Sequence, residues 1–201
     1  MKRGQTSSPS IIPFFIEAIR TIQPFPDTLI DIGCGAGMYG LMFKWYNRNK
    51  ETDVFGFNLT DTVDLKYYYD KLYSCNIEIR IDFIIDFIKS NSDSQSVISL
   101  IEVVEHLDKD KAINLLLRLS KLNVPIIITT PTHIYQSNTV KKPGYAHKCF
   151  FEKDELINLL KPYFKNVRTQ IIKDTIYRTE HQCYIFEHND SKPIPEGIRE
   201  K

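Results

Sequence analysis

Apolar residues along this chain of 201 residues fall into two alternating patterns, which predict strands and helices in turn. Short runs that predict strands occur at 29–32, 53–58, 97–103 and 124–129. The run at 124–129 is almost continuously apolar, which suits a parallel strand covered on both faces. Between these runs, apolar residues recur at helical spacing at 12–22, 38–45, 113–122 and 152–163. This alternation predicts an α/β domain with a parallel sheet and right-handed crossovers.

The middle of the chain supports a further strand. Ile77, Ile79 and Ile81 alternate with charged residues, which predicts a third strand there, after a helix over 63–73. Residues 83–90 fit either a short helix or a continuation of that strand.

The last part of the chain predicts two more strands, at 167–172 and 182–187, which could form an antiparallel pair. We therefore expect one domain over 8–188. The polar and charged ends, 1–7 and 189–201, are expected to be flexible tails.

A glycine-rich motif follows the first predicted strand. Asp31 is followed by Gly33, Gly35 and Gly37, and a helical pattern begins at Met38. Glycines allow positive φ and leave no Cβ between the backbone and a ligand, and the helix start presents free N–H groups. A dinucleotide-binding motif would need its third glycine at position 38. A turn that merely packs tightly is the plainer interpretation.

This motif resembles motif I of class I S-adenosylmethionine-dependent methyltransferases, and the order of elements resembles that family over 11–188. The resemblance implies a Rossmann-like three-layer sandwich. Its seven-stranded sheet would be mostly parallel, with one antiparallel strand near the C-terminus. It also implies S-adenosylmethionine as the cofactor and methyl transfer to an oxygen or nitrogen acceptor.

The resemblance further assigns the cofactor contacts to the carboxyl ends of the strands. At the second strand end, Asn58 stands where the family usually carries an acid that binds the ribose hydroxyls. Asp82 is expected to hold the adenine amino group, with Asp86 as the competing residue. The expected contacts are Asp31, Gly33, Cys34, Gly35, Gly37, Asn58, Asp82, Ile101 and Glu102.

The fourth strand end resembles the family's Glu-x-x-Glu-His-Leu segment. A helical turn there would place Glu102, Glu105 and His106 on one face. Together with His147 they resemble the metal site of methyltransferases that modify the 3′-terminal ribose of small RNAs. This donor set suits Mn²⁺ better than Mg²⁺. His106 and His147 are also candidate general bases, although such residues occur in metal-free relatives.

Composition and charge bear on the class of methyl acceptor and on the setting in which the protein works. A net charge of +1 gives no global field that favours nucleic acid, so the acceptor, a small molecule or a nucleic acid, stays open. The four cysteines lie far apart, which argues against a zinc site or a disulfide framework and fits a cytoplasmic protein. No apolar run is long enough to span a bilayer. A binding protein that has kept the fold without catalysis is the non-enzymatic alternative, and the oligomeric state is left open.

Overall fold

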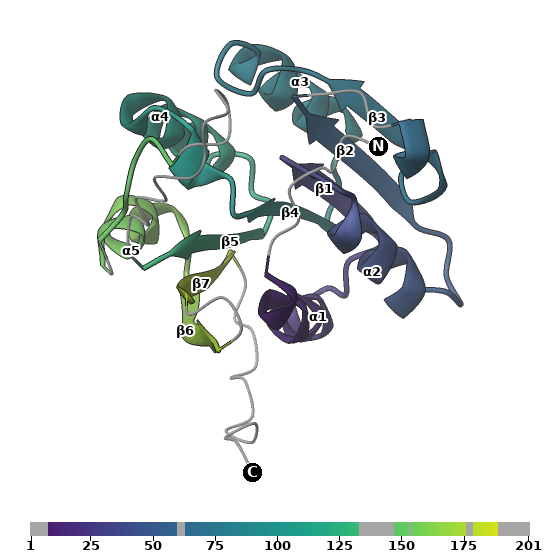
Figure 1. Cartoon of the computed structure of the whole chain (residues 1–201). Coiled ribbons are helices and arrows are strands. Elements are labelled where there is room, and N and C mark those ends of the chain that lie inside the picture. Colours follow the sequence, from purple (N-terminus) through teal and green to yellow (C-terminus); the bar gives the residue numbers. More distant parts are fainter. Residues whose placement is uncertain (1–7, 60–62, 133–146, 153, 176–178, 189–201) are drawn as a thin grey trace.

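The computed structural model of the chain describes residues 8–59, 63–132, 147–152, 154–175 and 179–188 (Figure 1). The strands are β1 Thr28–Ile32, β2 Asp53–Asn58, β3 Lys71–Ser74, β4 Ser96–Ile101, β5 Ile126–Pro131, β6 Asn166–Asp174 and β7 Thr179–Glu187. The α-helices are α1 Ile12–Thr21, α2 Met38–Tyr46, α3 Ile81–Asn91, α4 Lys109–Leu119 and α5 Glu155–Leu160. Short 3₁₀ helices are η1 Pro9–Ile11, η2 Val63–Tyr67, η3 Val104–His106 and η4 Lys161–Tyr163.

The strands form one seven-stranded sheet in the order β3-β2-β1-β4-β5-β7-β6 (Figure 1). The pairs from β3 to β5 are parallel, and β7 is antiparallel to both β5 and β6. The predicted Rossmann-like fold, with its antiparallel strand near the C-terminus, is confirmed. The predicted tails lie outside the described residues.

Helices cover both faces of the sheet. Because alternate residues of a strand point to opposite faces, each buried strand contributes to two cores. Ile30 of β1 belongs to the core under α3, α4 and α5. Its neighbour Leu29 belongs to the second core, under α1, α2 and η2. Each fully buried Ile or Leu side chain contributes about 1.5–3 kcal/mol to folding. Every residue of β4 and β5 is buried, as their continuous apolar character predicts.

The predicted third strand was wrong. β3 lies earlier, at Lys71–Ser74, in a segment that we expected to be helical, and Ile81 begins α3. The alternating isoleucines overlap the start of a longer pattern in which Ile81, Ile84, Ile85 and Ile88 recur at helical spacing and are all buried. Ile79, by contrast, is 76% exposed. The buried face of the helix therefore outweighs three alternating residues.

Within the described ranges, no helix combines the length and the apolar character that a bilayer crossing requires.

Candidate functional site

The glycine-rich turn joins β1 to α2 at the carboxyl edge of the sheet. It lies beside the switch point between β1 and β4, where sheets of this kind bind ligands. Gly33, Gly35 and Gly37 have φ values of 79°, 51° and 80°, which side-chain-bearing residues rarely adopt. A Cβ at Gly33 would lie 2.4 Å from a Val103 methyl, and one at Gly37 would lie 2.6 Å from a Leu65 methyl. Close packing therefore requires glycine at positions 33 and 37, and the left-handed backbone of the turn favours glycine at all three positions.

The carboxylate of Asp31 lies in a buried hydrogen-bond network with other side chains. Ser99 Oγ donates to one carboxylate oxygen at 2.7 Å, and the Tyr69 hydroxyl donates to the other at 2.6 Å. The Tyr69 oxygen in turn accepts from Gly40 N at 3.2 Å, in the first turn of α2. Burial raises the pKa of Asp31 to about 6, and the two hydrogen bonds limit that rise. Asp31 therefore ties the glycine turn to β4 and to the segment after η2.

Sequence reasoning missed both partners of Asp31. Ser99 could have been found, because it is a polar residue in an apolar strand and pairs in register with Asp31. Tyr69 carries no such signal, since it lies in a segment whose helix was predicted incorrectly.

Asn58 ends β2, as predicted, and lies beside the glycine turn. Its amide nitrogen donates to the Gly35 carbonyl oxygen at 3.3 Å. An aspartate cannot make this bond, because a carboxylate has no hydrogen to donate. The amide in place of the expected acid thus has a structural role in holding the turn.

Asp82 does not lie at a strand end. It occupies the first turn of α3, where its side chain is 85% exposed and pairs with Arg118 at 2.7 Å. Asp86, the competing residue, lies on the same helix and is 73% exposed. The strand that would have placed Asp82 at the cofactor ends instead at Ser74.

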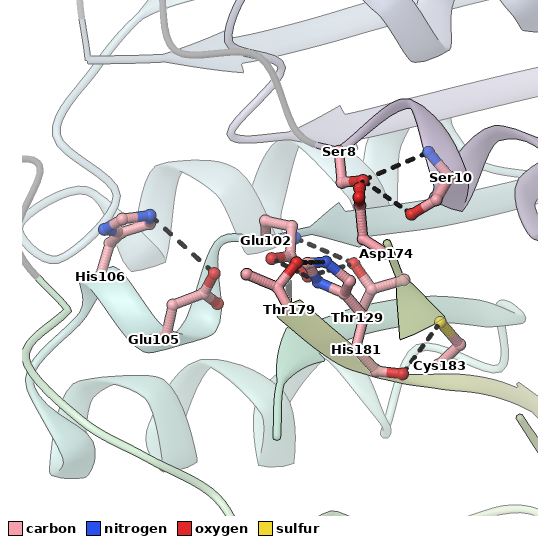
Figure 2. Close-up of polar contacts among 10 residues, drawn as sticks. All are labelled: Ser8, Ser10, Glu102, Glu105, His106, Thr129, Asp174, Thr179, His181 and Cys183. Carbon is pink, nitrogen blue, oxygen red and sulfur yellow. Dashed lines mark hydrogen bonds and ion pairs between the residues drawn. The ribbon is translucent and has the colours of Figure 1, made fainter. Parts of the chain in front are cut away.

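Ile101, the last residue of β4, is buried, and Glu102 then begins a sharp turn with a φ of 56°. The carboxylate of Glu102 accepts from Thr129 Oγ1 at 2.9 Å and lies 3.0 Å from His181 Nδ1 (Figure 2). Sequence reasoning also missed His181. Because β7 is antiparallel, its first residues lie at the carboxyl edge of the other strands, and this is how His181 reaches the site.

Glu105, His106 and His147 form a second group, which we call the ion cluster. One ligand atom from each lies within 4.8 Å of the others. Glu105 is 2% exposed, and neither of its carboxylate oxygens has a hydrogen-bond partner among the described residues. The Nε2 atom of His106 lies 3.9 Å from Glu105 Oε1. Burial raises the pKa of Glu105 well above its usual range, and the charge of Glu102 raises it further.

His147 lies next to this carboxylate because main-chain bonds hold the segment that follows it. Lys148 N and Cys149 N donate to the Glu105 carbonyl oxygen at 2.7 and 3.2 Å. Lys148 Nζ also bonds both carboxylate oxygens of Glu78. The imidazole rings of His106 and His147 pack edge to face, with their centroids 4.9 Å apart. Burial lowers the pKa of His147, which favours the neutral ring that binds metals.

The predicted set of four ligands comes together only in part. Glu102 lies outside the ion cluster, because the helical turn begins at Val104 and the left-handed backbone of Glu102 precedes it. Glu102, Glu105 and His106 therefore do not share a helical face, and the Glu102 carboxylate points to His181 instead.

Several solved methyltransferase structures share this fold. An O-methyltransferase family protein from Burkholderia thailandensis aligns with a TM-score of 0.57 and 11% identity, over 90% of this chain and 56% of that one. The N-terminal domain of EvdMO1 with SAH bound aligns with a TM-score of 0.62 and 11% identity, over 92% and 82%. The small RNA methyltransferase HEN1 aligns with a TM-score of 0.59 and 17% identity, over 97% and 28%.

No protein-family model matches the sequence, and no curated protein matches it. The chain spans 56% of the length of the Burkholderia protein and 28% of that of HEN1. At these identities the likeness establishes the fold alone, a Rossmann-like fold that the chain shares with these methyltransferase structures.

Proposed function

We propose that the chain is an S-adenosylmethionine-dependent methyltransferase whose domain spans 8–188. The observation that carries this proposal is the glycine turn with three left-handed glycines, placed between β1 and α2 at the switch point of the sheet. A structural neighbour that holds SAH on the same fold supports it. Four free cysteines are in keeping with a cytoplasmic setting.

The roles of the residues follow from where they lie. The backbone of the glycine turn, including Cys34, would approach the cofactor closely, and Asn58 and Ile101 would flank it from β2 and β4. Asp31 would act through Tyr69 and Ser99 by holding the turn in place. When bound, S-adenosylmethionine supplies an electrophilic methyl group, and the protein supplies position and electrostatics. His106 and His147 would lie on the acceptor side, toward an oxygen or nitrogen nucleophile, and Glu102 would lie beside the cofactor at the end of β4.

Calorimetry with S-adenosylmethionine tests the proposal. Gly35→Asn adds a side chain while keeping a residue type that tolerates left-handed backbone, so we expect at least tenfold weaker binding and a preserved fold. Asp86→Asn, on the exposed face of α3, is the matched control and should bind S-adenosylmethionine as the native chain does. Binding of NADH without binding of S-adenosylmethionine would refute the proposal. Binding of neither would favour the alternative of a catalytically degenerate binding protein.

The ion cluster favours a second, narrower candidate: a metal-assisted methyltransferase of the 3′-terminal ribose of RNA. A buried carboxylate without a partner is costly, and a cation beside it would remove that cost. One carboxylate and two imidazoles suit Mn²⁺ better than Mg²⁺. When bound, such an ion supplies Lewis acidity that lowers the proton affinity of a ribose hydroxyl. The likeness to HEN1 supports this candidate.

A small RNA with a 2′-hydroxyl at its 3′ end, compared with its 2′-deoxy counterpart, tests the candidate. Methylation of the first alone, dependent on Mn²⁺, is expected. Equal labelling of both RNAs, or labelling that is unchanged by a chelator, would contradict it.

A further inference from the structure

Glu102 is held by groups from two other strands, and this directs its carboxylate away from the ion cluster. Thr129 Oγ1 of β5 donates to Oε1 at 2.9 Å, and His181 Nδ1 of β7 lies 3.0 Å from Oε2. The other ring nitrogen of His181 lies 2.9 Å from Thr179 Oγ1. In Figure 2 the Glu102 carboxylate lies among these groups, whereas the Glu105 carboxylate faces His106. Both oxygens of Glu102 are thus engaged outside the cluster.

The main chain at Glu102 is fixed as firmly as its side chain. A φ of 56° costs a residue with a side chain about 1–2 kcal/mol. Glu102 N donates to the Thr129 carbonyl oxygen at 3.1 Å, which holds this conformation against β5. Strained residues persist where their surroundings over-determine them, and such residues concentrate at functional sites. Here Thr129 of β5 holds the strained main chain, and His181 of β7 holds the side chain.

We infer that His181 and Thr129 keep Glu102 from coordinating the ion, so that Glu105, His106 and His147 alone would hold it. The inference rests on the second candidate function, since it concerns the same ion. Three protein ligands leave coordination positions open, as catalytic metal sites do and closed structural sites do not. His181 is then a positioning residue, because it sets how many positions remain for oxygens of the acceptor.

Glu102 nevertheless lies only three residues before Glu105, on the segment of chain that leads into the cluster. A variant that releases Glu102 from His181 should therefore let this carboxylate join the ion. That expectation separates a restraining role of His181 from a purely structural one.

Calorimetric titration of the whole chain with Mn²⁺ alone tests the inference. Glu105→Gln and His147→Asn should weaken binding at least tenfold, because each removes a ligand. Glu102→Gln should weaken binding clearly less than Glu105→Gln does, because it removes a neighbouring charge but no ligand. His181→Leu should tighten binding at least threefold, and adding Glu102→Gln to it should cancel that gain. His188→Asn, on a histidine that packs against Phe164, controls for adventitious binding and should change nothing.

Two results would overturn the inference. One is a loss in Glu102→Gln as large as that in Glu105→Gln, which would make Glu102 a ligand. The other is weaker binding in His181→Leu, which would make His181 a support for a ligating Glu102. If His181→Leu does not fold, Thr129→Val removes the other restraint and should also tighten binding. If the native chain binds S-adenosylmethionine but no Mn²⁺, the inference fails with the metal candidate while the methyltransferase proposal stands.

Discussion

The bond between Tyr69 and Asp31 gives a prediction whose size depends on pH. Tyr69→Phe removes a hydroxyl that donates to the buried Asp31 carboxylate and accepts from Gly40 N. The ring that remains still fills the space beside Gly40 and Gly56, where an added Cβ would lie 2.5 and 2.8 Å from it. The variant therefore tests the hydroxyl rather than the packing.

The expected magnitude has two parts. Leaving Gly40 N without its partner costs about 1 kcal/mol at any pH. The bond to Asp31 lowers the pKa of that group, so its loss lets the pKa rise above about 6. A rise of about one unit costs a further ~1.4 kcal/mol, but only at pH values where Asp31 would otherwise be ionised. We expect a total loss of about 2–3 kcal/mol at pH 8 and about 1 kcal/mol at pH 4.5.

The direction of this pH dependence agrees with the titration of Asp31 in the native chain. Asp31 titrates near 6 when folded, against its ordinary 3.8, so the folded state favours the neutral form. Its contribution to stability is fully present below about pH 4 and is lost as the pH rises through 6, by about 3 kcal/mol. Because Tyr69→Phe raises the pKa of Asp31 further, this loss of stability continues to a higher pH in the variant than in the native chain.

Urea unfolding of the native chain and the variant at the two pH values measures this difference. Tyr67→Phe is the matched control, because Tyr67 is 73% exposed, and it should change the free energy of unfolding by less than about 0.5 kcal/mol. A loss in Tyr69→Phe that is equal at pH 4.5 and pH 8 would refute the argument, since the Asp31 charge would then play no part.

Two further substitutions probe the glycine turn and the corrected strand. Gly37→Ala should lower the free energy of unfolding, measured in urea, by about 2–3 kcal/mol, because its Cβ would lie 2.6 Å from Leu65 in a left-handed backbone. A loss below about 1 kcal/mol would contradict this and mean that the turn adapts to the added methyl group. Asp82→Asn should leave the affinity for SAH unchanged in calorimetry and cost at most about 1 kcal/mol of stability, because Asp82 makes only an exposed ion pair with Arg118, whereas clearly weaker binding would restore it to the cofactor site.

The order of the elements could be predicted because each buried strand or helix face leaves its own period in the sequence. The third strand could not, because β3 is four residues long and only partly buried, so its pattern is weak. Of the alternating isoleucines beyond it, Ile77 and Ile79 lie in the connection before α3, and only Ile81 belongs to that helix. Asp82 was misplaced for the same reason.

The candidate site was predictable where residues are close in sequence and less so where the sheet brings them together. The glycine turn and the pair Glu105–His106 are local motifs, and the structure places both at the carboxyl edge. The partners Tyr69, Ser99 and His181 come from other elements, and pairing register rather than spacing brings them in. The departure of Glu102 depends on its left-handed backbone and on bonds from β5 and β7, which no local side-chain pattern encodes.

The central claim is that the glycine turn binds S-adenosylmethionine, and backbone NMR tests it most directly. In ¹H–¹⁵N spectra of the native chain, added S-adenosylmethionine should shift the amide signals of Gly33, Gly35 and Gly37, together with that of Asn58. Unchanged glycine signals at millimolar S-adenosylmethionine would contradict the account, as would shifts confined to residues away from the carboxyl edge of β1 and β2.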